Sequence, residues 1–227
     1  MNSQSANLIS AASIAALIGY VVYHYSGLPD PMPTHWDSLG NANGFMSRLG
    51  GVAALIAVPI FSVILFKIIP LISPRGFRTD QFTGVVNSLM VGFVVFGCII
   101  AVVALQTALG ADINISKIVL ICVALLLIFV GNFMGKVRKN FFIGIRTPWT
   151  LASDEVWIKT HRLGGWCMVL AGILMATMAT IGVNAEYTVL VVVAMVLVPV
   201  VYSYFEYRAL EGFEGETETD GDIDSDK

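Results

Sequence analysis

The segment NFFIGIRTPWTLASDEVWIKTHRLGGW, residues 140–166, is the longest polar stretch in an otherwise apolar chain. Of the 227 residues, 56% are hydrophobic and 13% are charged, whereas soluble domains carry about 25% charged residues. The apolar runs lack the alternation of an outer-membrane β-barrel, so helices, which satisfy their own backbone groups, must cross the bilayer. We therefore predict an all-α integral membrane protein that holds residues 140–166, here called the central segment, at a membrane face.

Six apolar runs have about the ~20 residues that a helix needs to cross a hydrocarbon core of ~30 Å. The first run is followed by no small-residue cleavage site, so we expect a retained helix and not a signal peptide. The order helix, long loop, helix, short loop, helix occurs twice, as in two inverted three-helix halves. The predicted transmembrane helices are residues 8–25, 50–72, 83–109, 115–135, 163–183 and 187–207.

We divide the chain into two membrane halves and a tail. Residues 1–110 form the N-terminal half, with a loop rich in proline at 26–49, and residues 111–208 form the C-terminal half, with a polar loop at 136–162. Residues 209–227 hold eight of the sixteen acidic residues and few apolar ones, so they cannot bury a core. We predict that this tail is disordered.

Basic residues beside the helices predict the orientation, because cytoplasmic loops are enriched in Lys and Arg. Eleven of the thirteen basic residues flank one face, and only Arg48 and Lys117 flank the other. We therefore predict a multi-pass cell-membrane protein with both termini and the central segment in the cytoplasm, and with residues 26–49 outside. The eleven are Lys67, Arg75, Arg78, Lys136, Arg138, Lys139, Arg146, Lys159, Arg162, Arg208 and Lys227.

The outer loop at residues 26–49 combines prolines, which favour an extended chain, with Gly and Asn residues, which favour turns. Its run His35-Trp36-Asp37 admits two interpretations: a metal or ligand contact outside the cell, or a tryptophan resting at the membrane interface beside polar neighbours. The candidate site residues of this loop are Pro33, His35, Trp36, Asp37 and Gly44.

Polar residues inside the predicted helices are few. Asn87, Gln106 and Asn132 are expected to form hydrogen bonds between helices, and no acid accompanies them, so a proton relay is not indicated. The three cysteines each stand alone in or beside an apolar run, which favours reduced thiols over a disulfide or metal framework. We predict no metal and no cofactor.

Turn and cap residues divide the central segment into two parts. Because Thr147 precedes a proline, it favours an extended conformation, so we expect residues 145–149 to be a short non-helical excursion. Ser153, followed by two acidic residues, predicts a helix start. That helix should carry a Glu155–Lys159 pair at i,i+4, and a Gly164-Gly165 bend should follow where it enters the bilayer.

Aromatic and charged side chains of this helix suggest further contacts. Trp157 should stack one turn before His161. Arg146 either binds helix ends and acids such as Asp154 within the protein or binds an external anion. His161 with Asp154 and Glu155 could in principle serve as acid and base, but no metal spacing, nucleophile elbow or phosphate loop accompanies them. We predict that the protein is not an enzyme.

The run NFFIGIRTPWTL, residues 140–151, with Trp157, His161 and Arg162 after it, resembles the SdpI family of bacterial immunity membrane proteins. The proline and tryptophan loop after the first helix resembles the domain of unknown function often found N-terminal to that family. The motif residues that the resemblance singles out are Asn140, Gly144, Arg146, Thr147, Pro148, Trp149, Thr150, Trp157, His161 and Arg162.

The resemblance implies a membrane protein that protects its producer against a secreted peptide toxin. It also implies that such a protein can signal the presence of the toxin by drawing a cytoplasmic transcription repressor to the membrane. The predicted partners are then the lipid bilayer, a peptide toxin and a repressor, without direct binding of nucleic acid. The alternative is a small transporter or channel built as an inverted repeat, which polar residues converging at mid-bilayer would favour.

Overall fold

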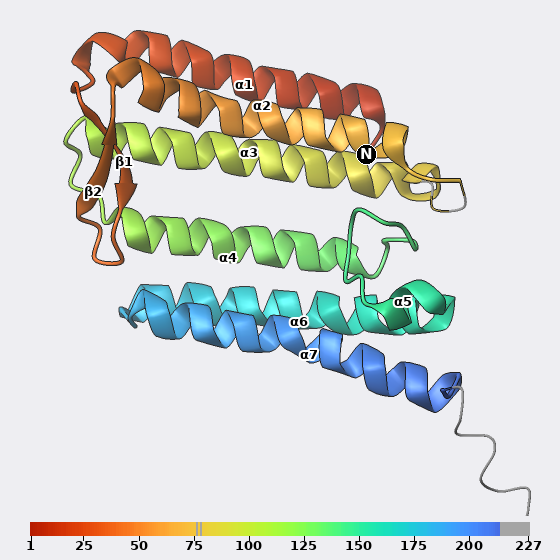
Figure 1. The fold of residues 1–227 in the computed structure, drawn as a ribbon. Helices are drawn as coiled ribbons and strands as arrows, with labels where there is room; N and C mark the ends of the chain where they lie inside the picture. Colours follow the sequence, from red (N-terminus) through yellow and green to blue (C-terminus); the bar gives the residue numbers. More distant parts are fainter. Residues whose placement is uncertain (76, 78, 214–227) are drawn as a thin grey trace, which may run out of the picture.

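The computed structural model describes residues 1–75, 77 and 79–213, and its main elements are six long helices (Figure 1). Each is long and apolar enough to cross a membrane, which confirms the predicted all-α membrane architecture. The helices are α1 (Ser3–His24), α2 (Arg48–Ile72), α3 (Thr83–Ala108), α4 (Ile115–Met134), α6 (Asp154–Ile181) and α7 (Ala185–Leu210).

The long helices run side by side and pack as two groups of three (Figure 1). Helix α3 packs against α1 and α2, and α6 packs against α4 and α7, while α3 and α4 meet along one seam. Two buried clusters fill the N-terminal group. One of them, which contains Phe66, Phe82 and Met90, also includes Val137 and Trp157 from the C-terminal half, so residues near the central segment take part in the packing of both groups.

Short elements cap both ends of the bundle. A single-turn helix follows α1 (Tyr25–Gly27), and strands β1 (Met32–Trp36) and β2 (Ala42–Met46) pair antiparallel in the outer loop. Another turn, Thr79–Phe82, precedes α3, and the short helix α5 (Pro148–Ala152) precedes α6. We call residues 32–46 the hairpin. It supplements the prediction, which foresaw only an extended entry and turns.

Helix ends differ from the predicted ones where caps, and not hydrophobicity, decide them. Helix α1 begins at Ser3 and not Leu8, because the Asn2 side chain accepts the Ser5 N–H at 2.8 Å. The predicted helix start after Ser153 is confirmed, and α6 then continues without interruption to Ile181.

The bend predicted at Gly164-Gly165 is wrong, since both residues lie within the continuous helix α6. Their role is close packing: a Cβ on Gly165 would lie 2.7 Å from the Gly131 carbonyl oxygen, and one on Gly164 would lie 2.6 Å from Ile145 Cδ1. Small residues let helix backbones approach in this way inside membranes.

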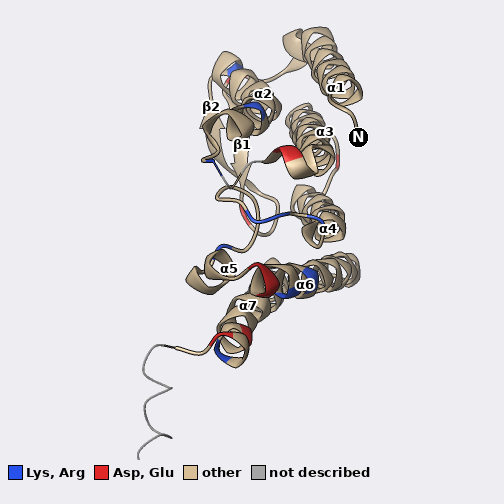
Figure 2. Cartoon of the chain, turned by 90° about the vertical axis from the view of Figure 1, so that its right-hand side faces the viewer, with Lys and Arg blue, Asp and Glu red and all other residues tan. Residues whose placement is uncertain are grey.

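The two ends of the bundle carry different features (Figure 1). We call one the hairpin end, which also holds the α3–α4 and α6–α7 connections. The other is the α5 end, which holds the N-terminus, α5 and the end of α7. Figure 2 faces the α5 end and shows basic residues where α4 ends and in the chain leading to α5. The predicted disordered tail lies, from residue 214 onward, outside the described residues.

Candidate functional site

Asn140 organises the loop that leads from α4 into α5. Its side chain is fully buried, and its Nδ2 donates to the carbonyls of Arg138 and Ile143 at 2.8 and 3.0 Å. Its Oδ1 accepts the backbone N–H groups of Phe142 and Ile143 at 2.8 and 2.7 Å. One amide thus satisfies four backbone groups of an irregular loop, which a buried loop requires.

Gly144 and His161 meet where this loop touches α6. Gly144 has φ +120°, and a Cβ there would lie 2.3 Å from His161 Nε2. That nitrogen accepts the Ile145 N–H at 3.0 Å, so Nδ1 carries the ring proton and donates to the Trp157 carbonyl at 2.8 Å. Both ring nitrogens of the buried His161 therefore hold backbone in place.

Trp157 joins the loop to the core. Its ring stacks on His161 with centroids 3.9 Å apart, as predicted, and only 1% of its surface is exposed. Its Nε1 donates to the Val137 carbonyl at 2.8 Å. The predicted pair of Lys159 with Glu155 also forms, at 2.8 Å, and Lys159 adds a second bond of 2.8 Å to Glu206 of α7.

Thr147 and Thr150 build α5. Each side chain bonds the other's backbone N–H, at 3.2 and 2.9 Å, which makes a capping box around Pro148 at the first helical position. The expectation that residues 145–149 are non-helical is therefore wrong for Pro148 and Trp149. The extended Thr147 is a cap, and the proline starts the helix. Thr147 Oγ1 also lies 3.0 Å from Ser203 Oγ, which ties α5 to α7.

Arg146 makes an internal contact, but with a different partner from the one predicted. Its Nη1 donates to the Phe141 carbonyl within the same loop. Asp154, which we expected beside it, pairs with Lys139 instead, because the chain turns through α5 between Arg146 and Asp154. The Arg146 side chain itself is exposed at the α5 end.

The remaining motif residues lie nearer the surface. Trp149 packs edge-on against Tyr204 of α7, with ring centroids 5.1 Å apart. Pro148 and Arg162 are exposed, and Arg162 borders a cavity of about 230 Å³ between α4 and α6 together with Trp166. The structure thus brings the predicted motif together at one end. Asn140, Thr150, Trp157 and His161 are buried, and Arg146, Pro148 and Arg162 face outward.

The hairpin holds the predicted outer residues in a tight turn. Asp37 accepts the N–H groups of Asn41 and Leu39 at 2.8 and 3.0 Å, and the Asn41 bond holds the pKa of Asp37 below its ordinary value. His35 Nδ1 lies 2.6 Å from Asn43 Oδ1. Among the described residues, no group of three His, Cys, Asp or Glu side chains lies where it could hold a metal ion.

Other outer residues shape the hairpin itself. Pro33 and Trp36 lie on β1, half-buried, and pair with Phe45 and Ala42. Gly44 faces His35, whose Cβ would lie 2.8 Å from a Cβ at position 44, so only glycine fits there. The turn is fastened to the C-terminal half because Ser116 Oγ donates to the Asp37 carbonyl at 2.9 Å.

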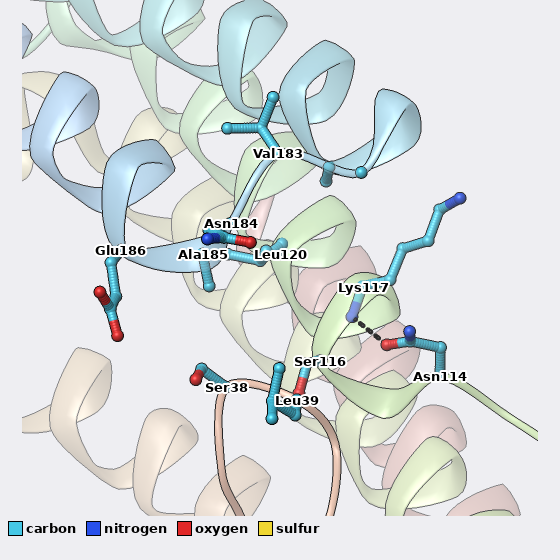
Figure 3. A pocket seen from close by; sticks show the side chains of 12 residues that line it. Ser38, Leu39, Asn114, Ser116, Lys117, Leu120, Val183, Asn184, Ala185 and Glu186 are labelled. Carbon is cyan, nitrogen blue, oxygen red and sulfur yellow. Dashed lines mark hydrogen bonds between the residues drawn. The ribbon is translucent and has the colours of Figure 1, made fainter.

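A cavity of about 550 Å³ lies beside the hairpin turn, between the start of α4 and the α6–α7 connection (Figure 3). Leu39, 78% exposed, stands at its hairpin wall, while Lys117 and Glu186 stand on the other walls. Lys117 Nζ donates to the Thr180 carbonyl at 3.3 Å. The cavity therefore combines apolar contact with a cation and an anion on separate elements.

The membrane amides are dispersed. Asn87 Nδ2 donates to Ser3 Oγ at 3.0 Å and Gln106 bonds Tyr20, so both join α3 to α1 as expected. Asn132 does not join helices: its Nδ2 donates to the Ile128 carbonyl of its own helix at 2.7 Å. Its exposed side chain has a backbone acceptor one turn away, and no neighbouring helix is required. Cys98, Cys122 and Cys167 are free thiols.

Two protein families match parts of this chain. Residues 136–204, which include the loop, α5, α6 and most of α7, match the SdpI/YfhL protein family. We call residues 136–204 the SdpI family region, after the family that they match. Residues 12–59, which include the hairpin, match a domain of unknown function, DUF1648. The resemblance that the motif indicated is confirmed by both matches.

A curated relative extends the similarity beyond the SdpI family region. The chain is 27% identical over 212 residues to "Immunity protein SdpI" of Bacillus subtilis (strain 168). The match covers 91% of this chain and 98% of that protein. No solved structure matches.

Sequence reasoning missed several residues that complete the site. Ser203 and Glu206 of α7 bond Thr147 and Lys159 of the central segment from 40 or more residues away, and the outer cavity joins Leu39 to Lys117 and Glu186. One signal was present: Ser203 and Glu206 are polar residues within an apolar helix, one turn apart on the same face.

Proposed function

We propose that this chain is a membrane immunity protein that protects its producer against a secreted, membrane-active peptide. The observation that carries the proposal is the similarity to an immunity protein along 91% of this chain and 98% of the relative. The match therefore includes both the hairpin and the central segment. That likeness, together with the exposed surfaces at the two ends of the bundle, supports a protective role for this chain.

The hairpin end is the proposed contact surface for the peptide. A membrane-active peptide carries apolar side chains and charges, and the outer cavity offers both, through Leu39 and through Lys117 and Glu186. Phe45 and Met46 add exposed apolar side chains on β2. Aromatic and apolar anchors near a membrane surface are the usual source of binding energy in such contacts.

The α5 end is the proposed cytoplasmic face. It carries most of the described basic residues, including Lys67, Arg138 and Arg162, whereas Arg48 and Lys117 lie toward the hairpin end. The positive-inside rule then places the hairpin outside, where a secreted peptide arrives. Both chain termini would be cytoplasmic in this orientation.

Exposed motif residues at the α5 end are the proposed surface for a cytoplasmic regulator. Arg146, Pro148 and Arg162 face outward, while Asn140 and His161 hold the loop that presents them. A repressor drawn to this surface would report the presence of the peptide. Arginine at such a surface favours an acidic partner, because its planar guanidinium binds carboxylates in a bidentate manner.

The dispersed amides support immunity over transport. Asn87 and Gln106 each serve one neighbouring helix, and Asn132 serves its own backbone. A transporter of the inverted-repeat kind would gather such groups around a substrate near mid-bilayer. His161, the histidine among the candidates for acid–base chemistry, uses both ring nitrogens for backbone bonds, which supports a non-enzymatic role.

The test is expression of the chain in a sensitive host, followed by exposure to supernatant peptides of the producing organism. We expect preserved growth and membrane potential. Arg146→Ala should abolish protection while the protein still reaches the membrane. Arg75→Ala, which removes an exposed arginine from the same end outside the motif, should protect normally. Sensitivity of cells that carry normal levels of the intact protein would refute immunity, and solute flux in vesicles would then test transport.

A further inference from the structure

We propose that the α5 end binds one anionic phospholipid in a site between α3 and α4, with the headgroup in a basic cavity and an acyl chain along the seam between the two helix groups. This inference does not depend on the immunity function. It begins from a cavity of about 520 Å³. Its walls come from Met1, from the turn before α3 and the start of α3, from the end of α4 and the residues up to Arg138 that follow it, and from Ile158 of α6.

Charge in this cavity has one sign. Lys136 and Arg138 line it, and of the described residues that form its walls none is acidic. Three acids elsewhere at this end are paired with lysines outside the cavity: Asp154 with Lys139, and Glu155 and Glu206 with Lys159. Basic pockets between transmembrane helices near the cytoplasmic surface are the usual binding sites for anionic lipid headgroups.

The cavity also offers neutral hydrogen-bonding groups. Gln81 is exposed at its rim, and Ser88 lies deeper on α3, where its hydroxyl already donates to the Gly84 carbonyl at 2.9 Å and can still accept. A glycerol headgroup carries hydroxyl donors that match these oxygen atoms. Phe82 and Phe133 complete the walls with apolar surface, which suits the start of an acyl chain.

A second, almost wholly apolar cavity of about 380 Å³ lies on the same seam, nearer mid-membrane. On α3 its residues Gly92, Val95 and Ile99 continue the helical face of Val85 and Ser88 at spacings of three and four residues. On α4, Cys122, Leu126 and Phe129 likewise continue the face of Phe133. The two cavities therefore lie on the same face of both helices, along one seam that we call the groove, in which the Phe129 ring packs against Gly92.

The length of this groove fits one acyl chain. From Ser88 to Ile99 the helix rises roughly 16 Å, at ~1.5 Å per residue. One leaflet contributes about half of a hydrocarbon core of ~30 Å, so the groove reaches from the headgroup level to mid-bilayer. A soluble phosphate has no acyl chain to fill such an apolar groove. We therefore assign the site to a lipid of the leaflet at the α5 end.

Occupancy of the site would also act on the motif. Val137 lies between Lys136 and Arg138, and its carbonyl accepts the Trp157 indole N–H. A headgroup that holds Lys136 and Arg138 fixes this carbonyl, and with it the loop that Asn140 organises. The lipid should therefore stabilise the contact between the two helix groups.

The experiment uses the full chain, solubilised in neutral detergent, with phosphatidylglycerol or phosphatidylcholine added, and scores retained lipid by native mass spectrometry. We expect retention of one phosphatidylglycerol. Lys136→Gln with Arg138→Gln should lower its affinity on the order of tenfold. The control, Lys67→Gln with Arg75→Gln, removes the same charge from the same end without touching the cavity and should retain the lipid normally.

Four outcomes would overturn all or part of the proposal. Equal retention of the two lipids would show that the site does not select an anionic headgroup. An equal loss of binding in both double variants would show that general surface charge, and not the cavity, attracts the lipid. Displacement by glycerol phosphate as readily as by full-length phosphatidylglycerol would show a site for free anions. Phosphatidylglycerol with six-carbon chains should bind much more weakly than the full-length lipid, because it cannot fill the groove, and equal binding would contradict the acyl-chain part.

Discussion

The two ends of the molecule differ in which side chains they bury and which they expose. At the α5 end, Asn140, Thr150 and His161 are buried and bonded to the chain's own backbone. At the hairpin end, Leu39 and Phe45 are 78% and 57% exposed, and Leu39 lines a cavity that holds opposite charges. A recognisable motif can thus be mostly scaffold, while the surface proposed to meet the peptide lies in a less distinctive loop.

This difference predicts that changes of the buried motif residues at the α5 end lower stability, whereas changes of the exposed hairpin side chains alter protection with little effect on stability. Four substitutions test this difference between the α5 end and the hairpin end. They are given in order of decreasing expected effect on the free energy of unfolding. Each is measured as the melting temperature of the purified protein in detergent, together with protection in the sensitive host.

Gly144→Ala should have the largest effect. It strains a residue at φ +120° and drives a Cβ onto His161 Nε2, so the bond to the Ile145 N–H must also yield. We expect a loss of about 3–5 kcal/mol, from backbone strain and an unsatisfied buried group. Gly110→Ala is the matched control, since Gly110 has φ +90° with open space around it. Similar losses in the two variants would show that strain alone acts and that the contact with His161 does not.

Asn140→Asp should come next. The carboxylate keeps the acceptor for Phe142 and Ile143 but loses the donor, and it places a charge against the carbonyls of Arg138 and Ile143. We expect a loss of about 2–4 kcal/mol. Asn132→Asp, at an exposed amide that bonds only its own helix, is the control. An unchanged melting temperature for Asn140→Asp would remove the proposed organising role of this residue.

Trp157→Phe should have a moderate effect. The phenyl ring can still stack on His161, but the Val137 carbonyl loses its indole donor. We expect a loss of about 1–2 kcal/mol, the cost of one unsatisfied buried acceptor. Trp166→Phe changes a tryptophan that is 74% exposed and should leave the melting temperature unchanged. Equal melting temperatures for the two variants would contradict the role of the Val137 bond.

Phe45→Ala should have the smallest effect on stability and a clear effect on protection. The exposed ring contributes less than about 0.5 kcal/mol to folding, but it belongs to the surface proposed to meet the peptide. Leu71→Ala, at an exposed apolar residue of α2 distant from the hairpin, is the control for lost membrane-facing area. Full protection by Phe45→Ala, together with Leu39→Ala, would move the peptide contact away from the hairpin.

The amino-acid sequence alone determined the class of the protein and the position of its helices. An apolar run as long as the bilayer is thick must form a helix, because a helix satisfies its backbone hydrogen bonds within one segment. Six spans could therefore be predicted and were found. Contacts local in the chain were also predictable, such as the Trp157–His161 stack and the Glu155–Lys159 pair, because helical periodicity places these side chains together.

Only the tertiary structure decided which motif residues are scaffold and which are surface. Thr147 and Lys159 both find their partners on α7. The cavity beside Leu39 takes its other walls from α4 and from the α6–α7 connection. Asp154, one of the possible partners predicted for Arg146, pairs with Lys139 because the path of α5 between Arg146 and Asp154 depends on a cap that proline completes. Contacts between elements distant in sequence depend on packing of whole helices, and no local pattern in the chain encodes that geometry.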